Sequence, residues 1–136
     1  MITYDFSGTV TIVTGAASGI GLATAGAVAR AGGMVFLNDL PGSSALEAAV
    51  ASLKAGGQDV YPCPADQSDP DAVTRAVEGV VARTGKINYL VNNAATPGTR
   101  APILPADFAR MDEAFWQRLI SINQIGPFRW VKAAAP

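Results

Sequence analysis

The chain has 136 residues, of which 49% are hydrophobic and 15% are charged. This composition is typical of a globular domain and excludes a disordered chain. Its net charge of −1 provides no basic surface for nucleic acid or anionic lipid, so we expect a small-molecule partner. With one cysteine and no histidine, the sequence excludes an internal disulfide, a Cys/His metal site and a Ser-His-Asp triad.

Apolar runs and glycine-closed helical segments alternate along the first two thirds of the chain. Strands are predicted over Thr9–Thr14, Met34–Asp39, Asp59–Pro62 and Ile87–Asn92. Helices are predicted over Ile20–Ala31, Ser43–Lys54 and from Ser68-Asp69-Pro70 to Thr84. This alternation predicts a single α/β domain, a Rossmann-type parallel sheet with helices on both faces and right-handed crossovers.

The alternation stops after the fourth strand. Asn93–Met111 contains three prolines, which predicts a long loop of the kind that often serves function. From Asp112 we expect a final helix that runs to the end of the chain, with a kink or an interruption at Gly126-Pro127.

The N-terminal segment, residues 1–8, lacks the basic and apolar regions of a signal peptide. No apolar run approaches the roughly 18 residues that a membrane-spanning helix needs. We therefore expect a cytoplasmic protein that does not enter a membrane.

Polar residues lie at or just after the ends of the predicted strands, namely Thr14, Asp39, Asp66 and Asn92. In parallel sheets ligands bind beyond the carboxyl ends of the strands, where the strand order reverses. These four positions are therefore the candidate site.

The turn Gly15–Gly21 lies between the first strand and the first helix, where small residues let backbone amides approach a phosphate. Its Gly-x-x-x-Gly-x-Gly spacing differs from the general Gly-x-Gly-x-x-Gly fingerprint, so a tight structural turn is an alternative interpretation.

Asp39 lies 18 residues after Gly21, where a carboxylate can accept from both ribose hydroxyls and repel a 2′-phosphate. The glycine turn and residues 40–45 contain no Arg or Lys, so NAD is favoured over NADP. The alternative is that Asp39 only caps the following turn.

Thr14–Gly21 resembles the Thr-Gly-x-x-x-Gly-x-Gly motif of the short-chain dehydrogenase/reductase family. Asp66 resembles the acidic residue that contacts adenine, and Asn92–Ala95 resembles Asn-Asn-Ala-Gly with alanine at its last position. Trp116–Phe128 resembles the helix of the catalytic asparagine, here Asn123. The resemblance covers the whole chain in register.

The resemblance implies a strand order of 3-2-1-4 and hydride transfer between NAD and an alcohol or ketone. It also implies a homo-oligomer, a dimer or tetramer, when the protein is complete. Asn123 is the expected catalytic residue. The expected cofactor-binding residues are Gly15, Ala17, Ser18, Gly19, Ile20, Gly21, Asp39, Leu40, Asp66, Gln67, Asn92, Asn93, Ala94 and Ala95.

Structural alternatives stay open for three of these positions. Asp66 can be loop polarity, Asn92 a strand-end amide that satisfies neighbouring loops, and Asn123 a solvent-facing residue. Phe115, Trp116 and Leu119 are expected in the core or in a subunit interface.

The family completes its active site with a serine and a Tyr-x-x-x-Lys, in which the tyrosine exchanges a proton with the substrate. The sequence contains Tyr4, Tyr61 and Tyr89, and none has a lysine four positions later. We therefore expect the N-terminal portion of a longer enzyme. A non-catalytic NAD-binding module and a truncated product without a stable fold are the alternatives, and the substrate is not identified.

Overall fold

The four strands form one parallel sheet in the computed structural model, which describes residues 3–135. The strands are β1 (Val10–Val13), β2 (Met34–Leu37), β3 (Val60–Pro62) and β4 (Tyr89–Val91). Their order is β3-β2-β1-β4, and all three pairings are parallel. This confirms the predicted sheet and the order 3-2-1-4.

Each strand is shorter than predicted, because the register of paired residues stops before the ends of the predicted runs. In β1, for example, Val10 pairs with Met34 and Val13 with Leu37. Thr14 and Asp39 then follow in the connecting turns. The strands thus deliver these residues to the carboxyl edge of the sheet.

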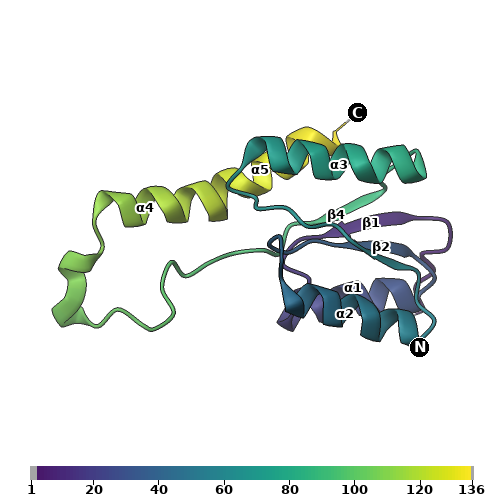
Figure 1. The fold of residues 1–136 in the computed structure, drawn as a ribbon, viewed down its shortest axis with the longest axis horizontal. Helices are drawn as coiled ribbons and strands as arrows, with labels where there is room; N and C mark the ends of the chain where they lie inside the picture. The colour runs from purple at the N-terminus through teal and green to yellow at the C-terminus, as the bar shows by residue number, and fades with distance from the viewer. Residues whose placement is uncertain (1–2, 136) are drawn as a thin grey trace.

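Helices cover both faces of the sheet, as Figure 1 shows. The helices α1 (Gly19–Arg30) and α2 (Ser44–Ala55) lie on one face, and α3 (Pro70–Thr84) and α5 (Gly126–Ala134) lie on the other. None of the helices described within residues 3–135 is long and apolar enough to cross a membrane.

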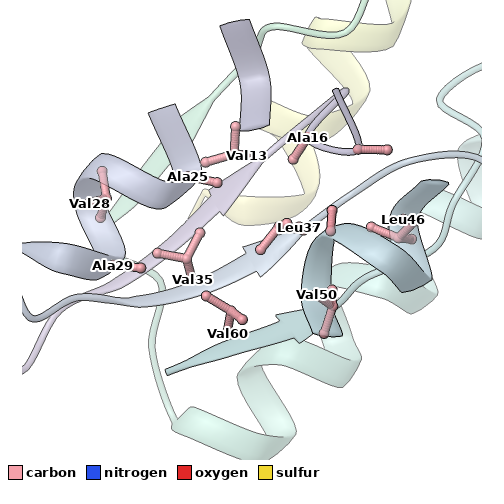
Figure 2. Packing of buried hydrophobic residues seen from close by; sticks show 12 residues of the cluster. Val13, Ala16, Ala25, Val28, Ala29, Val35, Leu37, Leu46, Val50 and Val60 are labelled. Carbon is pink, nitrogen blue, oxygen red and sulfur yellow. The ribbon is translucent and has the colours of Figure 1, made fainter. Parts of the chain in front are cut away.

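The face under α1 and α2 holds one of two hydrophobic cores (Figure 2). Val13, Val35 and Leu37 of the sheet meet small residues of α1, such as Ala25 and Ala29. Small helical residues let α1 approach the sheet closely, and all of these side chains are buried. This packing holds α1 against the sheet.

The opposite face holds the second core, in which Ile12 and Phe36 pack against Val73 and Val77 of α3. Trp130 of α5 belongs to this core and is fully buried. Since residues on both faces of β1 and β2 are buried, these strands are nearly continuous apolar runs, as in other buried parallel sheets.

The segment after β4 differs from the prediction. The expected loop contains a 3-10 helix, η1 (Pro105–Arg110), and α4 (Glu113–Ile120) follows with Asp112 as its N-cap. Figure 1 shows η1 and α4 extending away from the sheet. The final helix is interrupted, as the prediction allowed, but the interruption lies earlier than Gly126-Pro127: a π-helical turn, η2 (Ser121–Ile125), separates α4 from α5.

The cause of this interruption is Pro127, which begins α5 together with Gly126. Proline has no N–H to donate to the carbonyl four residues earlier, which is that of Asn123, and its ring crowds that carbonyl. The helix therefore widens before the proline, and the break precedes the predicted kink position. Met1, Ile2 and Pro136, which the predicted N-terminal segment and last helix include, lie outside the described residues.

Candidate functional site

A pocket of about 480 Å³ lies at the carboxyl end of the sheet. Many of the residues predicted for cofactor binding line it, namely Gly15, Ser18, Asp39, Leu40, Asp66, Gln67, Asn93, Ala94 and Ala95. Asn38, Ala65, Thr96 and Ile122 complete the lining. Most residues that line the pocket were therefore among those expected from the sequence, and they lie at the edge where the carboxyl ends of the parallel strands meet.

The N-terminus of α1 opens beside this pocket without a side-chain cap. Its N-cap, Ser18, makes no capping hydrogen bond, and the first turn has no acidic residue. By contrast, Ser43, Asp69 and Asp112 all cap the helices that follow them. Free amides and the positive end of the helix dipole at α1 can therefore attract an anion.

Two glycines of this turn are favoured for different reasons, one for lack of space and one for its backbone conformation. A Cβ at Gly21 would lie 2.2 Å from the carbonyl oxygen of Gly15. Gly19 has φ of 54°, a left-handed conformation that favours glycine, and a Cβ there would meet nothing within 4 Å. Gly21 thus serves close packing, whereas the space beside Gly19 is open.

Asp39 connects the glycine turn to the end of β2. Its Oδ2 accepts from the N–H of Ala17 at 3.3 Å, and its Oδ1 accepts from the N–H of Leu40 at 2.8 Å. The capping role considered as an alternative is therefore present. Each carboxylate oxygen accepts more than one hydrogen bond, so Asp39 can still bind a ligand hydroxyl.

Asp66 also has a local role, because its Oδ1 accepts from the N–H of Ser68 at 2.8 Å. Its neighbour Gln67 is 5% exposed and spans two segments. The Nε2 of Gln67 donates to the carbonyl of Ala94 at 3.1 Å and to that of Ile122 at 2.8 Å. Gln67 thus joins the loop after β4 to the π-helical turn.

Asn93, rather than Asn92, is the strand-end amide that satisfies neighbouring backbone groups. Its Nδ2 donates to the carbonyls of Thr14 (3.0 Å) and Gly15 (3.2 Å), and its N–H donates to the Thr14 hydroxyl (3.0 Å). The side chain of Asn92 is exposed, and among residues 3–135 its one hydrogen bond is a long one, from Nδ2 to the carbonyl of Pro127 at 3.5 Å. The structural role considered for Asn92 therefore belongs mainly to its neighbour.

Asn123 lies in η2, half-buried, and pairs with the backbone of Thr96 in both directions. The N–H of Thr96 donates to Asn123 Oδ1 at 2.8 Å, and Asn123 Nδ2 donates to the Thr96 carbonyl at 2.8 Å. The solvent-facing alternative for Asn123 is therefore wrong. The side chain holds the pocket wall at Thr96 against η2.

Some expected residues lie outside the pocket lining, and some lining residues were not expected. Ala17, Gly19, Ile20, Gly21 and Asn92 do not line the pocket.

Among the lining residues that were not expected, Asn38 is buried and donates from Nδ2 to the carbonyls of Cys63 (2.9 Å) and Ala65 (3.0 Å). Asn38, Thr96 and Ile122 each adjoin a residue that the sequence singled out, and adjacency was the only available signal.

The family model for short chain dehydrogenases matches residues 9–136. A 3-oxoacyl-(acyl-carrier-protein) reductase of Synechocystis is 36% identical over 126 residues, which are 93% of this chain and 49% of that protein. The similarity therefore extends over almost the whole chain.

Two solved structures have the same fold as this chain. A metagenomic short-chain oxidoreductase in complex with NADP superposes with a TM-score of 0.84 and 33% identity, over 96% of this chain and 57% of that one. An NAD⁺-bound xylitol dehydrogenase superposes with a TM-score of 0.83 and 36% identity, over 96% of this chain and 48% of that one.

The chain spans about half the length of these relatives. Over that half, the family model, the sheet order and the glycine turn agree. The chain belongs to the short-chain dehydrogenase family.

Proposed function

We propose that the chain is the cofactor-binding part of an NAD-dependent oxidoreductase that acts on an alcohol or ketone. When bound, NAD would supply the nicotinamide carbon that accepts or delivers a hydride. The observation that best supports this proposal is that the uncapped N-terminus of α1 and the Asp39 carboxylate lie at the same pocket. A dinucleotide needs both features, one for its pyrophosphate and one for its adenosine ribose.

The proposed contacts fit the chemistry of the pocket. The amides that begin α1 would hold the pyrophosphate, Asp39 the ribose, and Asp66 with Gln67 the adenine side. Ile20 and Leu40 are apolar and 79% and 56% exposed, so a bound adenosine or nicotinamide would cover apolar surface beside the pocket. The remaining cofactor residues predicted from the sequence belong to the same proposal.

The preference for NAD rests on charge. Among the described residues that line the pocket, Asp39 and Asp66 are acidic and none is Lys or Arg. A 2′-phosphate beside Asp39 would meet a carboxylate without a compensating cation. The relatives include one protein bound to NADP and one bound to NAD⁺, so the family alone does not decide the cofactor.

Asn123 would act in the catalytic step at the active-site end of the last helix. The proton exchange would need the family's tyrosine and lysine, which residues 1–136 do not contain in the required spacing. For this reason a non-catalytic NAD-binding module stays the second candidate. It predicts NAD binding without turnover of any alcohol.

The homo-oligomer and the cytoplasmic location stay predictions. Exposed apolar side chains on α4 and α5 support an interface with another copy. These are Trp116, Ile120, Phe128 and Val131, with exposed fractions of 51%, 42%, 62% and 52%.

The test is calorimetric titration of the full-length protein with NAD and with NADP. We expect much tighter binding of NAD. The Asp39→Ala variant should lose about 1.5–3 kcal/mol of NAD binding free energy, the value of a charge-assisted hydrogen bond, and so have a weaker preference for NAD.

Asp39→Asn is the matched control, because an amide oxygen can still accept from the Leu40 N–H while the negative charge is gone. We expect this variant to narrow the preference as well. Equal affinities for NAD and NADP in the unmodified protein would contradict the assignment of Asp39.

A further inference from the structure

The π-helical turn η2 exposes backbone carbonyls that two side chains from elsewhere engage. A π-helical turn inserts one residue and disturbs the regular bonding of a helix, so its carbonyls need other donors. The Ser121 carbonyl accepts from Arg129 Nη1 at 3.0 Å, and the Ile122 carbonyl accepts from Gln67 Nε2 at 2.8 Å. Asn123 is the next residue.

Arg129 and Gln67 are themselves connected. Arg129 Nη1 also donates to the Gln67 carbonyl at 2.8 Å, and its guanidinium lies 3.4–3.5 Å from the Ser121 hydroxyl. Arg129 therefore ties α5 to η2 and to the loop after β3. Gln67 ties that same loop to η2 and, through Ala94, to the loop after β4.

Two further observations indicate that the position of Gln67 is tightly specified. A Cβ at Gly126 would lie 2.9 Å from Cγ and Cδ of Gln67, so this helical position has no room for a side chain. The Oε1 of Gln67 is buried and has no hydrogen-bond partner among the described residues. The amide is therefore oriented by its two donated bonds, at the cost of an unpaired acceptor.

We propose that Gln67 and Arg129 are positioning residues that set where η2 presents Asn123 to the pocket. The proposal deepens the proposed function, on which its kinetic part rests. Neither residue needs to touch a substrate, because both act through the carbonyls of Ser121 and Ile122. Displacement of η2 would then break the pairing between Asn123 and Thr96.

The first test is Gln67→Met in the full-length protein, with hydrogen exchange of the Thr96 N–H as the readout. Methionine has a similar volume and no donor, and it also removes the unpaired acceptor, so the core should persist. We expect exchange at Thr96 to accelerate roughly tenfold because local opening becomes easier.

The controls are internal and matched. The Asn38 N–H, which donates to the Val13 carbonyl at 2.9 Å directly after β2, should exchange at its original rate. Gln117→Met makes the same substitution on the exposed surface of α4 and should leave the Thr96 rate unchanged. Unchanged Thr96 exchange in Gln67→Met, with the sheet intact, would overturn the proposal.

The second test is kinetic and uses Arg129. Arg129→Met should lower kcat roughly ten- to a hundredfold, since small misplacements of a catalytic group have effects of this size. The KM for NAD should change less than about threefold, because the hydrogen bonds of Arg129 among the described residues go to Gln67 and Ser121 and not to the glycine turn or Asp39. Arg129→Lys keeps the charge with fewer donors and should recover part of the loss.

A purely structural role would instead raise KM and lower kcat together with the melting temperature, and that result would overturn the positioning role. At saturating NAD, where a weaker contact of Gln67 with the adenine side does not limit the rate, Gln67→Met should lower kcat little further in an Asn123→Ala background if it acts through Asn123. Full additivity of the effects of the two substitutions on kcat would contradict an action of Gln67 through Asn123. If the unmodified protein has no turnover, the proposed function fails. The hydrogen-exchange experiment would still test whether Gln67 holds η2 in place.

Discussion

Asn123 combines a structural contact with a predicted catalytic role. Both atoms of its amide are engaged by the backbone of Thr96, so the side chain is oriented before any ligand binds. Preorganised groups of this kind contribute to catalysis because no reorganisation is needed during the reaction. The same contacts also shape the pocket wall at Thr96.

We therefore predict that Asn123→Ala in the full-length enzyme lowers turnover roughly a hundredfold and leaves the NAD dissociation constant within about threefold. Turnover should fall because the variant removes the amide and releases the loop at Thr96. NAD binding should persist because α1 and Asp39 stay in place. Steady-state kinetics and calorimetry provide the two measurements. Normal turnover would return Asn123 to a structural role.

Cys63 permits a prediction about pH. It lies directly after β3, 5% exposed, and burial raises the pKa of its thiol to about 12 from a reference value of 9.0. Between these values the unfolded chain releases the proton while the folded chain retains it. The contribution to stability is therefore complete below about pH 9 and is lost as pH rises towards 12.

We expect the free energy of unfolding to fall more steeply over this range in the unmodified protein than in Cys63→Ala. Denaturant titrations at several pH values measure the difference. In the folded protein at pH 8 the thiol should also resist labelling reagents, because the thiolate is the reactive form. Rapid labelling without denaturant would show that the site opens.

At the scale of elements, two helical glycines provide a matched pair. A Cβ at Gly79 in α3 would meet nothing within 4 Å, whereas one at Gly126 would meet Gln67 at 2.9 Å. Gly79→Ala should therefore stabilise the protein by about 0.5–1 kcal/mol through helix propensity. Gly126→Ala should destabilise it by about 1–3 kcal/mol through overpacking. Urea titration of both variants tests this, and equal shifts would contradict the packing at Gln67.

The sheet was predictable because each strand is an apolar run and each of the first three helices ends at glycine, whereas its order 3-2-1-4 was implied by the family resemblance. The widened turn was not, because its cause lies later in the chain, at Pro127, and its stabilising contacts come from Gln67, far away in sequence. Local patterns do not report such contacts. The structural role considered for Asn92 belongs to Asn93 for a simpler reason: successive residues along an extended chain point to opposite faces.

At the scale of the molecule, β4 is an edge of the described sheet, since it pairs with β1 alone. Leu90 and Val91 are half-buried there and Tyr89 is 49% exposed. An apolar strand with unpaired amides and carbonyls on one side invites pairing with another chain. The projecting segment of η1 and α4 adds exposed apolar surface, including Phe108 at 73%.

Residues 1–136 expressed alone should therefore self-associate and show no dehydrogenase turnover. The chemical reason is independent of the physical one. No tyrosine in the sequence has a lysine four positions later, so the proton exchange, which typically contributes 10²–10⁴-fold, has no group to perform it. NAD binding should survive wherever the fold does, because the glycine turn and Asp39 lie within these residues.

The measurements are size-exclusion chromatography, thermal unfolding and NADH production with a panel of alcohols, each compared with the full-length protein. Binding of NAD without turnover by residues 1–136, together with turnover by the full-length protein, would support the proposal that these residues bind the cofactor but lack the groups for proton exchange. Binding without turnover in both would favour the non-catalytic module. A monomeric, cooperatively unfolding chain of these residues that oxidises an alcohol would contradict both the edge argument and the need for the tyrosine and lysine.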